Sequence, residues 1–190
     1  MDYVDEANSL FTVLTILANA AFVALIVVGI AALLGGRARA SSARVVTAIG
    51  PRAPVVALVV AAVATAGSLY YSEIVGYIPC ELCWYQRICM YPLAVILAVG
   101  VIRRDRTVVW YAAPFVVIGA PVSLYHWLVE RVPSLAEGSS CSVFVPCNVP
   151  YFEELGYITL AFMALSAFLL VGALLVVTLV HDRTTRKAVT

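Results

Sequence analysis

The stretch PCELCWYQRICMYPLAVILAVGVIRR, residues 79–104, begins with a pair of cysteines, Cys80 and Cys83, continues as an apolar run that includes Cys89, and has a basic end. The cysteines of this pair are three positions apart, the apolar run covers 84–102, and the stretch ends with Arg103 and Arg104. An apolar run of this length is close to the roughly 20 residues with which a helix crosses a bilayer. A basic end is typical of the cytoplasmic side of such a helix. The stretch therefore predicts a membrane-spanning helix with a cysteine pair at its outer end.

The composition of the whole chain agrees with this interpretation. Of its 190 residues, 63% are hydrophobic and only 12% are charged, whereas average globular domains are about 25% charged. Five apolar segments have near-spanning or greater length, at 10–34, 55–71, 84–102, 108–129 and 157–180. The sequence thus predicts an all-α integral membrane protein, one membrane domain over 1–190, with outer loops at 72–83 and 130–156. Membrane lipid is the expected surrounding, and no basic run indicates nucleic acid.

The charged residues divide between two sides of these segments. One side carries ten of the 12 basic residues: Arg37, Arg39, Arg44, Arg52, Arg103, Arg104, Arg106, Arg183, Arg186 and Lys187. The other side carries nine of the 11 acidic residues: Asp2, Asp5, Glu6, Glu73, Glu81, Glu130, Glu137, Glu153 and Glu154. Because Lys and Arg mark cytoplasmic loops, we expect a multi-pass protein of the cell membrane with its N-terminus outside and its C-terminus in the cytoplasm.

The first apolar segment does not have the pattern of a secretory signal. Its start, MDYVDEANSL, is acidic, and the segment is longer than the 7–15 apolar residues of a signal peptide. We therefore interpret it as a retained helix. Asn19 is a polar group within this helix, and we expect it to hydrogen-bond a neighbouring helix.

Four of the five cysteines fall on the outer side, as the pairs Cys80–Cys83 and Cys141–Cys147. Extracytoplasmic surroundings permit disulfides, whereas the cytosol keeps most thiols reduced. The second pair lies in one loop segment and closes a small ring. It is either a structural staple or a labile bridge that exchanges with a partner. We expect Cys89 to be a small buried apolar side chain.

The first pair lies where a helix is expected to start, because Pro79 suits a first helical turn. Unpaired backbone N–H groups and the helix dipole then favour the thiolate forms of Cys80 and Cys83. Arg87 is one turn beyond Cys83, on the same helix face. It either stabilises a thiolate or oxyanion near the membrane edge or extends to the lipid headgroups.

PCELCWYQR followed by an apolar span, and then CSVFVPCN followed by YITLAFMALSAF, resembles the DsbB disulfide-oxidase family. The likeness is greatest to BdbC-type members, whose second pair is closely spaced, and it covers about 55–180. It implies a four-helix transmembrane bundle with a quinone beside the C-x-x-C, to which this chain adds one N-terminal transmembrane helix. The implied thiol:quinone oxidoreductase reoxidises an extracytoplasmic DsbA-like thioredoxin-fold protein. The electrons pass to the quinone pool, ubiquinone or menaquinone.

The resemblance also implies roles for individual residues. Cys80 and Cys83 correspond to the quinone-proximal pair, with the Cys83 thiolate against the quinone ring, and Arg87 takes the quinone-side arginine position. Cys141 corresponds to the residue that forms a mixed disulfide with the partner, and Cys147 to the one that passes the exchange to Cys80.

His126, near the outer end of the fourth segment, lies in the region where the family has a histidine near the quinone. A neutral imidazole there can shuttle a proton. The alternative is an interfacial histidine beside Trp127 without a chemical role.

Other functions remain as alternatives. A conduit that carries reducing electrons outward needs thiols on the inner side, whereas both pairs are expected outside. In the vitamin-K-epoxide-reductase-like quinone reductases, the loop cysteines precede the C-x-x-C, whereas here they follow it. A zinc site of four cysteines would use a C-x5-C spacing outside the usual range. A non-catalytic membrane protein with structural disulfides is the last alternative.

Overall fold

The computed structural model of the protein describes residues 2–137, 141 and 144–189. Within these residues, five helices are long and apolar enough to cross a membrane. The elements in chain order are α1 (Asp2–Leu33), α2 (Gly36–Ile49), α3 (Ala53–Leu69), the π-helical turn η1 (Tyr70–Ile74), α4 (Glu81–Arg103), α5 (Val108–Val129), α6 (Pro133–Glu137) and α7 (Leu160–Val189). The prediction of an all-α membrane protein is confirmed.

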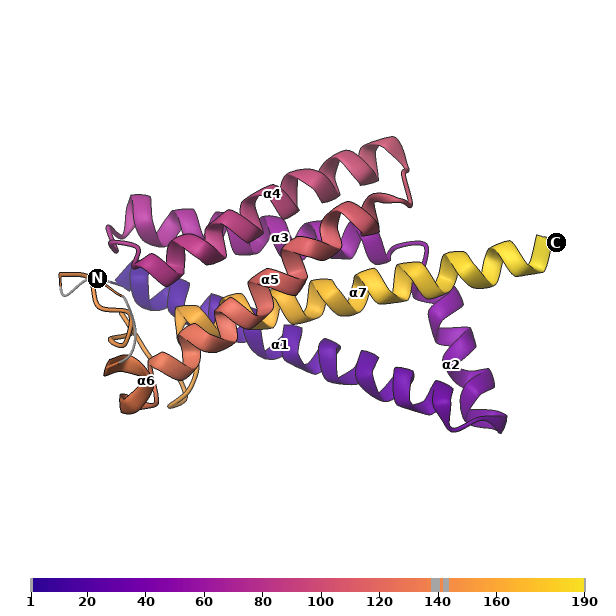
Figure 1. Ribbon diagram of the computed structural model, residues 1–190, viewed down its shortest axis with the longest axis horizontal. Coiled ribbons are helices and arrows are strands. Elements are labelled where there is room, and N and C mark those ends of the chain that lie inside the picture. Colours follow the sequence, from indigo (N-terminus) through magenta and orange to yellow (C-terminus); the bar gives the residue numbers. More distant parts are fainter. Residues whose placement is uncertain (1, 138–140, 142–143, 190) are drawn as a thin grey trace.

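Four of the long helices form a bundle in which α3 packs on α4, α4 on α5, α5 on α7 and α7 on α3. The remaining long helix, α1, packs on α7 outside this ring, and α2 contacts both α1 and α7. Figure 1 shows the N-terminus, η1 and the long loop before α7 at one end of the molecule, with α2 and the C-terminus at the other. The architecture is the predicted four-helix bundle with one additional N-terminal helix.

Small residues allow the bundle helices to approach closely. Ala53, Ala57 and Ala61 recur every fourth residue along α3 and are all buried. This spacing puts them on one helix face, and small side chains at such a face let neighbouring backbones come together in a membrane. At Gly119 of α5, even an added Cβ would clash with the ring of Phe168. The position of α5 against α7 therefore depends on glycine.

The helix α1 has buried polar side chains next to the bundle and many apolar side chains on its exposed face. Asn8 and Thr15 are buried, whereas the exposed side chains include Leu10, Val13, Leu17, Val23, Val27 and Ile30. Asn19 Nδ2 donates to Ser166 Oγ of α7 at 2.8 Å, which confirms the predicted helix–helix hydrogen bond. An apolar exterior around internally satisfied polar groups is the arrangement that a bilayer requires.

The bounds of the helices differ from the predicted segments mainly at helix ends. The fourth segment, 108–129, coincides with α5, but α1 begins at Asp2 and α7 continues to Val189. The connection that carries Arg37, Arg39 and Arg44 contains a helix, α2, which sequence reasoning did not predict. Hydropathy identifies only membrane-spanning segments, so it did not predict α2, which mixes polar and apolar residues.

Candidate functional site

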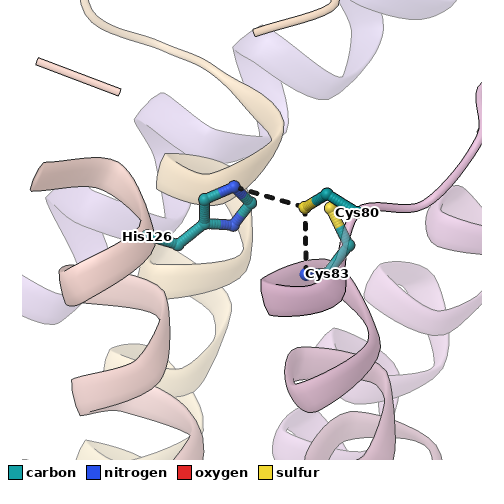
Figure 2. Close-up of side chains that lie close together, drawn as sticks. All are labelled: Cys80, Cys83 and His126. Carbon is teal, nitrogen blue, oxygen red and sulfur yellow. Dashed lines mark hydrogen bonds between the residues drawn. The ribbon is translucent and has the colours of Figure 1, made fainter. Parts of the chain in front are cut away.

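The sulfur atoms of Cys80 and Cys83 meet the imidazole of His126 at the end of the bundle that holds η1 and the long loop (Figure 2). Cys80 Sγ accepts a hydrogen bond from the backbone N–H of Cys83 at 3.2 Å. The same sulfur lies 3.6 Å from His126 Nε2. The structure thus brings together three of the residues predicted from sequence, two at the start of α4 and one on the last turn of α5.

Cys80 is the N-cap of α4 and not part of its first turn. Its backbone is extended, with φ −70° and ψ 171°, and α4 begins at Glu81. The thiol sulfur satisfies a backbone donor of the first turn, as the side-chain oxygen of a serine cap does. Pro79 therefore lies before the cap, and the expectation that it occupies the first helical turn was wrong. As predicted from the sequence, the Cys80 sulfur lies at the N-terminus of a helix, where a backbone N–H donates to it.

The surroundings of Cys80 favour its ionised form. The pKa of the Cys80 thiol is well below its usual value, chiefly because of the hydrogen bond with the Cys83 side chain and then because of His126. Burial acts in the opposite direction and does not prevail. A thiolate is the nucleophile and the metal ligand among the forms of cysteine. Cys80 is therefore the thiol of this pair that is prepared for exchange chemistry.

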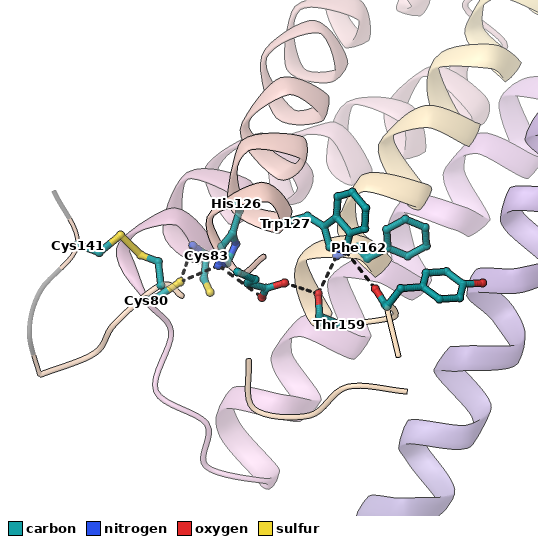
Figure 3. Close-up of polar contacts among 10 residues, drawn as sticks. Cys80, Cys83, His126, Trp127, Cys141, Thr159 and Phe162 are labelled. Carbon is teal, nitrogen blue, oxygen red and sulfur yellow. Dashed lines mark hydrogen bonds and ion pairs between the residues drawn. A yellow bond between two sulfur atoms is a disulfide. The ribbon is translucent and has the colours of Figure 1, made fainter. Parts of the chain in front are cut away.

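The loop between α5 and α7 carries the second cysteine pair to the same end of the molecule. Cys141 and Cys147 are joined by a disulfide with a Cα–Cα distance of 5.9 Å, whereas Cys80 and Cys83 are free thiols. Cys147 is buried in one cluster with Cys80 and Val129, and Figure 3 shows the disulfide beside Cys80. The two cysteine pairs therefore adjoin through Cys80.

Cys83 faces a different neighbour, an apolar cavity of about 380 Å³. Residues of α1, α3, α4 and α7 form its walls, among them Leu14, Val63, Met90 and Phe168, and Cys83 lies at its edge. Cys80 and His126 do not line the cavity. Both cysteines thus pack near the loop disulfide, but Cys83 alone of the pair lines the cavity.

Arg87 also lines this cavity and is fixed to its wall. Its Nε donates to Ser68 Oγ at 3.0 Å and its Nη2 to the Ser68 carbonyl oxygen at 3.1 Å. The guanidinium group lies over the Trp84 ring, 5.3 Å from its centroid, and Ser68 Oγ also bonds Tyr91 Oη at 3.1 Å. These contacts hold the cation between α3 and α4, beside the cavity and one turn below Cys83.

Gln86 is a lining residue that sequence reasoning missed. Its side chain is buried, and its Nε2 has no hydrogen-bond partner among the described residues. A buried donor without a partner costs free energy, and a polar side chain within a membrane helix is a functional-site hypothesis by default. The charge of its neighbour Arg87 indicated a possible site, whereas the uncharged amide of Gln86 gave no such indication.

Glu130 is the second residue that sequence reasoning missed, since it was counted among the outer-side charges. Its side chain is only 5% exposed and its Oε1 lies 3.9 Å from His126 Nε2. Thr159 Oγ1 donates to Glu130 Oε2 at 2.6 Å, and Figure 3 shows this line of polar contacts running from Cys80 through His126 to Thr159. The spacing of four residues between His126 and Glu130 on one helix face was the available indication.

The donor atoms of this site also resemble a metal-ligand set. One ligand atom each from Cys80, Cys83 and His126 lie within 4.8 Å of one another. The four-cysteine zinc site considered from the sequence is not the arrangement found, because Cys141 and Cys147 are bonded to each other. A three-ligand site with an open position is typical of catalytic rather than structural zinc.

Comparison with known proteins gives the chain's relatives. The family model for "Disulfide bond formation protein DsbB" matches residues 51–178. Disulfide bond formation protein C of Bacillus subtilis (strain 168) is 48% identical over 113 residues, which are 60% of this chain and 82% of that protein. A probable disulfide formation protein of Oceanobacillus iheyensis is 50% identical over 115 residues, 58% of this chain and 77% of that protein.

A third relative gives a similar result. A probable disulfide formation protein of Coxiella burnetii (strain CbuK_Q154) is 43% identical over 118 residues, 61% of this chain and 80% of that protein. No solved structure matches the chain. The family match includes α3, α4, α5 and most of α7 together with both cysteine pairs, whereas α1 and α2 lie before it. The chain belongs to the DsbB family of disulfide bond formation proteins.

Proposed function

We propose that this protein oxidises an extracytoplasmic, DsbA-like thioredoxin-fold protein and delivers the electrons to a membrane quinone, ubiquinone or menaquinone. The coarser part of this function follows from the family: the chain is a multi-pass membrane thiol-disulfide oxidoreductase. The observation that carries the finer part is that two neighbouring thiols differ in their access to the cavity. Cys80 packs with the loop disulfide, and Cys83 lines the apolar cavity.

The order of exchange in the proposal follows from this arrangement. A reduced partner attacks the Cys141–Cys147 disulfide from solution, through Cys141 as the family resemblance implies. The loop dithiol that results reduces the Cys80–Cys83 bond, with Cys147 attacking Cys80. Burial of Cys147 and Cys80 in one cluster supports that pairing. Attack at Cys80 releases Cys83, and Cys141 then attacks Cys147 to reform the loop disulfide. The lowered pKa of Cys80 makes it a good leaving group in that last step.

The cavity fits a quinone in its chemistry. Predominantly apolar walls with a few convergent polar groups are typical of cofactor pockets, and about 380 Å³ lies within the usual range. Gln86 Nε2 is a buried donor without a protein partner, and Arg87 supplies a fixed cation on the same wall. Both suit a ligand whose carbonyl oxygens gain negative charge on reduction. A bound quinone supplies the two-electron acceptor, and Cys83 is the sulfur within its reach.

The position of His126 alters the role expected for it. Its Nε2 contacts Cys80 Sγ at 3.6 Å, and the residue does not line the cavity. We therefore assign His126 to the stabilisation of the Cys80 thiolate, as a group that acts beside the quinone site and not within its walls.

The proposal includes an orientation in the membrane. The cysteine end of the bundle faces the extracytoplasmic side, and α2 and the C-terminus face the cytoplasm. The support is the sidedness of charge, since Arg37, Arg39 and Arg44 lie on α2 and Arg103 and Arg104 end α4. Labelling of reduced, intact cells with a membrane-impermeant thiol reagent tests it, with labelling of Cys141 expected.

Reconstitution tests the electron path directly. Purified protein in quinone-containing vesicles should reduce the quinone when a reduced thioredoxin-fold substrate is added. Cys83→Ser should abolish quinone reduction, whereas Cys89→Ser, at a buried core cysteine, should leave the rate unchanged. A native rate in the Cys83→Ser variant would refute the proposed path.

Zinc binding is the second candidate, favoured by the ligand set of Cys80, Cys83 and His126. In that case the reduced protein should retain about one zinc ion per chain, held by these three ligands with the fourth position open. Metal analysis of the purified wild type and the Cys80→Ser variant distinguishes zinc binding from quinone reduction as the function of this site. Metal retained by the wild type alone, together with absent quinone reduction, would favour zinc.

A further inference from the structure

One nitrogen of His126 faces two groups that can carry a negative charge. His126 Nε2 lies 3.6 Å from Cys80 Sγ and 3.9 Å from Glu130 Oε1. The side chains of His126 and Glu130 are 4% and 5% exposed, so water provides little screening of either charge. A thiolate and a carboxylate therefore compete here for one imidazole edge.

The surroundings of the other ring nitrogen, Nδ1, indicate which tautomer of His126 is present. His126 Nδ1 is buried and has no hydrogen-bond partner among the described residues. Placing the proton of a neutral imidazole on Nε2 avoids a buried N–H without an acceptor. The single Nε2–H can then donate to Cys80 or to Glu130, but not to both at full strength. The site is arranged to hold one negative charge.

The remaining groups around Glu130 provide little further counter-charge, because Arg131, whose charge acts on Glu130, is paired elsewhere. Thr159, which precedes α7, gives a neutral hydrogen bond to Oε2 at 2.6 Å. Arg131 adjoins Glu130 in the chain, but its Nη2 pairs with Glu153 at 3.2 Å and its Nη1 donates to the Gly156 carbonyl oxygen. From the start of α4, the titratable side chains that face this region are Cys80 and Cys83.

We propose that Glu130 takes up a proton when the Cys80–Cys83 disulfide is reduced and releases it when the disulfide forms again. Glu130 then acts through His126 as a redox-linked proton acceptor. The inference rests on the proposed function, since it takes Cys80–Cys83 to be the pair that cycles between dithiol and disulfide.

The chemical balance of the step is complete. The loop dithiol loses two electrons and two protons as the Cys141–Cys147 bond forms, and the Cys80–Cys83 bond breaks. Cys83 takes one of the protons, Cys80 remains a thiolate, and Glu130 takes the second proton. One negative charge, first on Glu130 and then on Cys80, is present before and after the step. On reoxidation both protons leave with the electron pair.

The electrostatics of Glu130 agree with this geometry. Burial has the largest effect and raises the pKa of the Glu130 carboxyl, whereas Thr159, His126 and Arg131 lower it. The Cys80 charge also raises this pKa and is the smallest of these effects. A group whose pKa is raised by a neighbouring negative charge binds a proton as that charge appears. The direction of the Cys80 effect agrees with the proposal, which is carried by the position of His126 Nε2 between Cys80 Sγ and Glu130 Oε1.

Reduction potential as a function of pH tests the proposal. In the full-length Cys141→Ser/Cys147→Ser protein, Cys80–Cys83 can be equilibrated with thiol–disulfide buffers without quinone or partner. Two protons per electron pair change the potential by about 59 mV per pH unit, and one proton by about 30 mV, because a tenfold change in a two-electron equilibrium is about 29.6 mV. We expect the larger slope near neutral pH with Glu130 and the smaller slope after Glu130→Gln.

A matched control is Glu153→Gln, which removes an exposed carboxylate of the same loop and should keep the larger slope. Glutamine at position 130 can still accept the hydrogen bond from Thr159, so the variant should fold. Equal slopes with and without Glu130 would overturn the inference. The proposed function is assayed separately as quinone reduction, so either result can fail while the other stands.

Infrared difference spectroscopy of the same protein gives a second readout that does not depend on the variant. Reduction of Cys80–Cys83 should produce the C=O stretching band of a protonated carboxyl group, shifted in heavy water. Absence of that band on reduction would overturn the inference even if Glu130→Gln failed to fold.

Discussion

Replacing His126 by phenylalanine should raise the pKa of the Cys80 thiol. The substitution keeps an aromatic ring in a buried position and removes the Nε2 atom that lies 3.6 Å from Cys80 Sγ. A hydrogen bond to a charged group contributes about 1.5–3 kcal/mol, and one pKa unit corresponds to about 1.36 kcal/mol. The imidazole favours the thiolate, so its loss should raise the pKa of Cys80 by about 1 to 2.

The pH dependence of Cys80 alkylation by a small neutral reagent measures this change, with the Cys80 peptide quantified by mass spectrometry. Serine should replace the other reactive cysteines, Cys89, Cys141 and Cys147. Cys83 must stay, because its hydrogen bond makes the largest contribution to the lowered pKa of Cys80. His181→Gln, at the opposite end of α7, controls for loss of a histidine.

The direction of the effect provides the refutation. Because the pKa of Cys80 is lowered in the folded protein, alkylation should persist at neutral pH and decline only as the pH falls through that lowered value. In the His126→Phe variant the decline should occur at higher pH. A midpoint that stays unchanged, or moves to lower pH, would show that His126 does not stabilise the thiolate.

Three further predictions concern the cavity and the bundle. Arg87→Lys cannot reproduce both donations to α3, and losing about 1.4 kcal/mol of positioning corresponds to a tenfold rise in the quinone KM, measurable in vesicles. Leu14→Trp should fill the cavity from α1 and also raise this KM, while stopped-flow exchange between the two cysteine pairs stays unchanged. Gly119→Ala forces a contact with Phe168 and should destabilise the bundle by about 1–3 kcal/mol in denaturant unfolding. Gly29→Ala, with open space around it, should not destabilise; equal effects would contradict the packing.

Hydropathy predicted the spans well because lipid imposes a simple requirement on the sequence. The fourth segment, 108–129, coincides with α5, since basic and polar residues flank an uninterrupted apolar run. The same reasoning could not find α2, whose sequence GRARASSARVVTAI satisfies no spanning pattern. This short helix packs against α1 and α7. Such contacts between segments distant in sequence cannot be recognised from a local sequence pattern.

The sequence predicted those parts of the site whose chemistry depends on a few uncommon residue types in a fixed order. The cysteine pairs, Arg87 and His126 were named because few other residue types do their chemistry. Glu130 was not, because nothing local distinguishes a buried carboxyl from a solvated one. Its burial depends on Thr159, which is 29 positions away in sequence. Gln86 escaped for the same reason, since only the assembled cavity shows its amide without a partner.

The role of α1 illustrates what the family alone leaves open. The matched residues begin after α1 and α2, yet Phe11, Leu14 and Thr15 of α1 line the cavity. The hydrogen bonds of Asn8 and Asn19 to Tyr71 and Ser166 hold α1 in that position. The additional helix therefore completes a wall of the proposed quinone site, which a four-helix bundle without it would leave to lipid or to another element.

The stoichiometry of quinone reduction in a single turnover tests the electron path most directly. Fully reduced wild-type protein, freed of reductant and mixed with excess quinone, should form two quinols per chain, one for each cysteine pair. The Cys141→Ser/Cys147→Ser protein should form one. The Cys80→Ser/Cys83→Ser protein, with its loop dithiol reduced, should form none. Quinol formed by this last variant would contradict the claim that electrons reach the quinone only through Cys80 and Cys83.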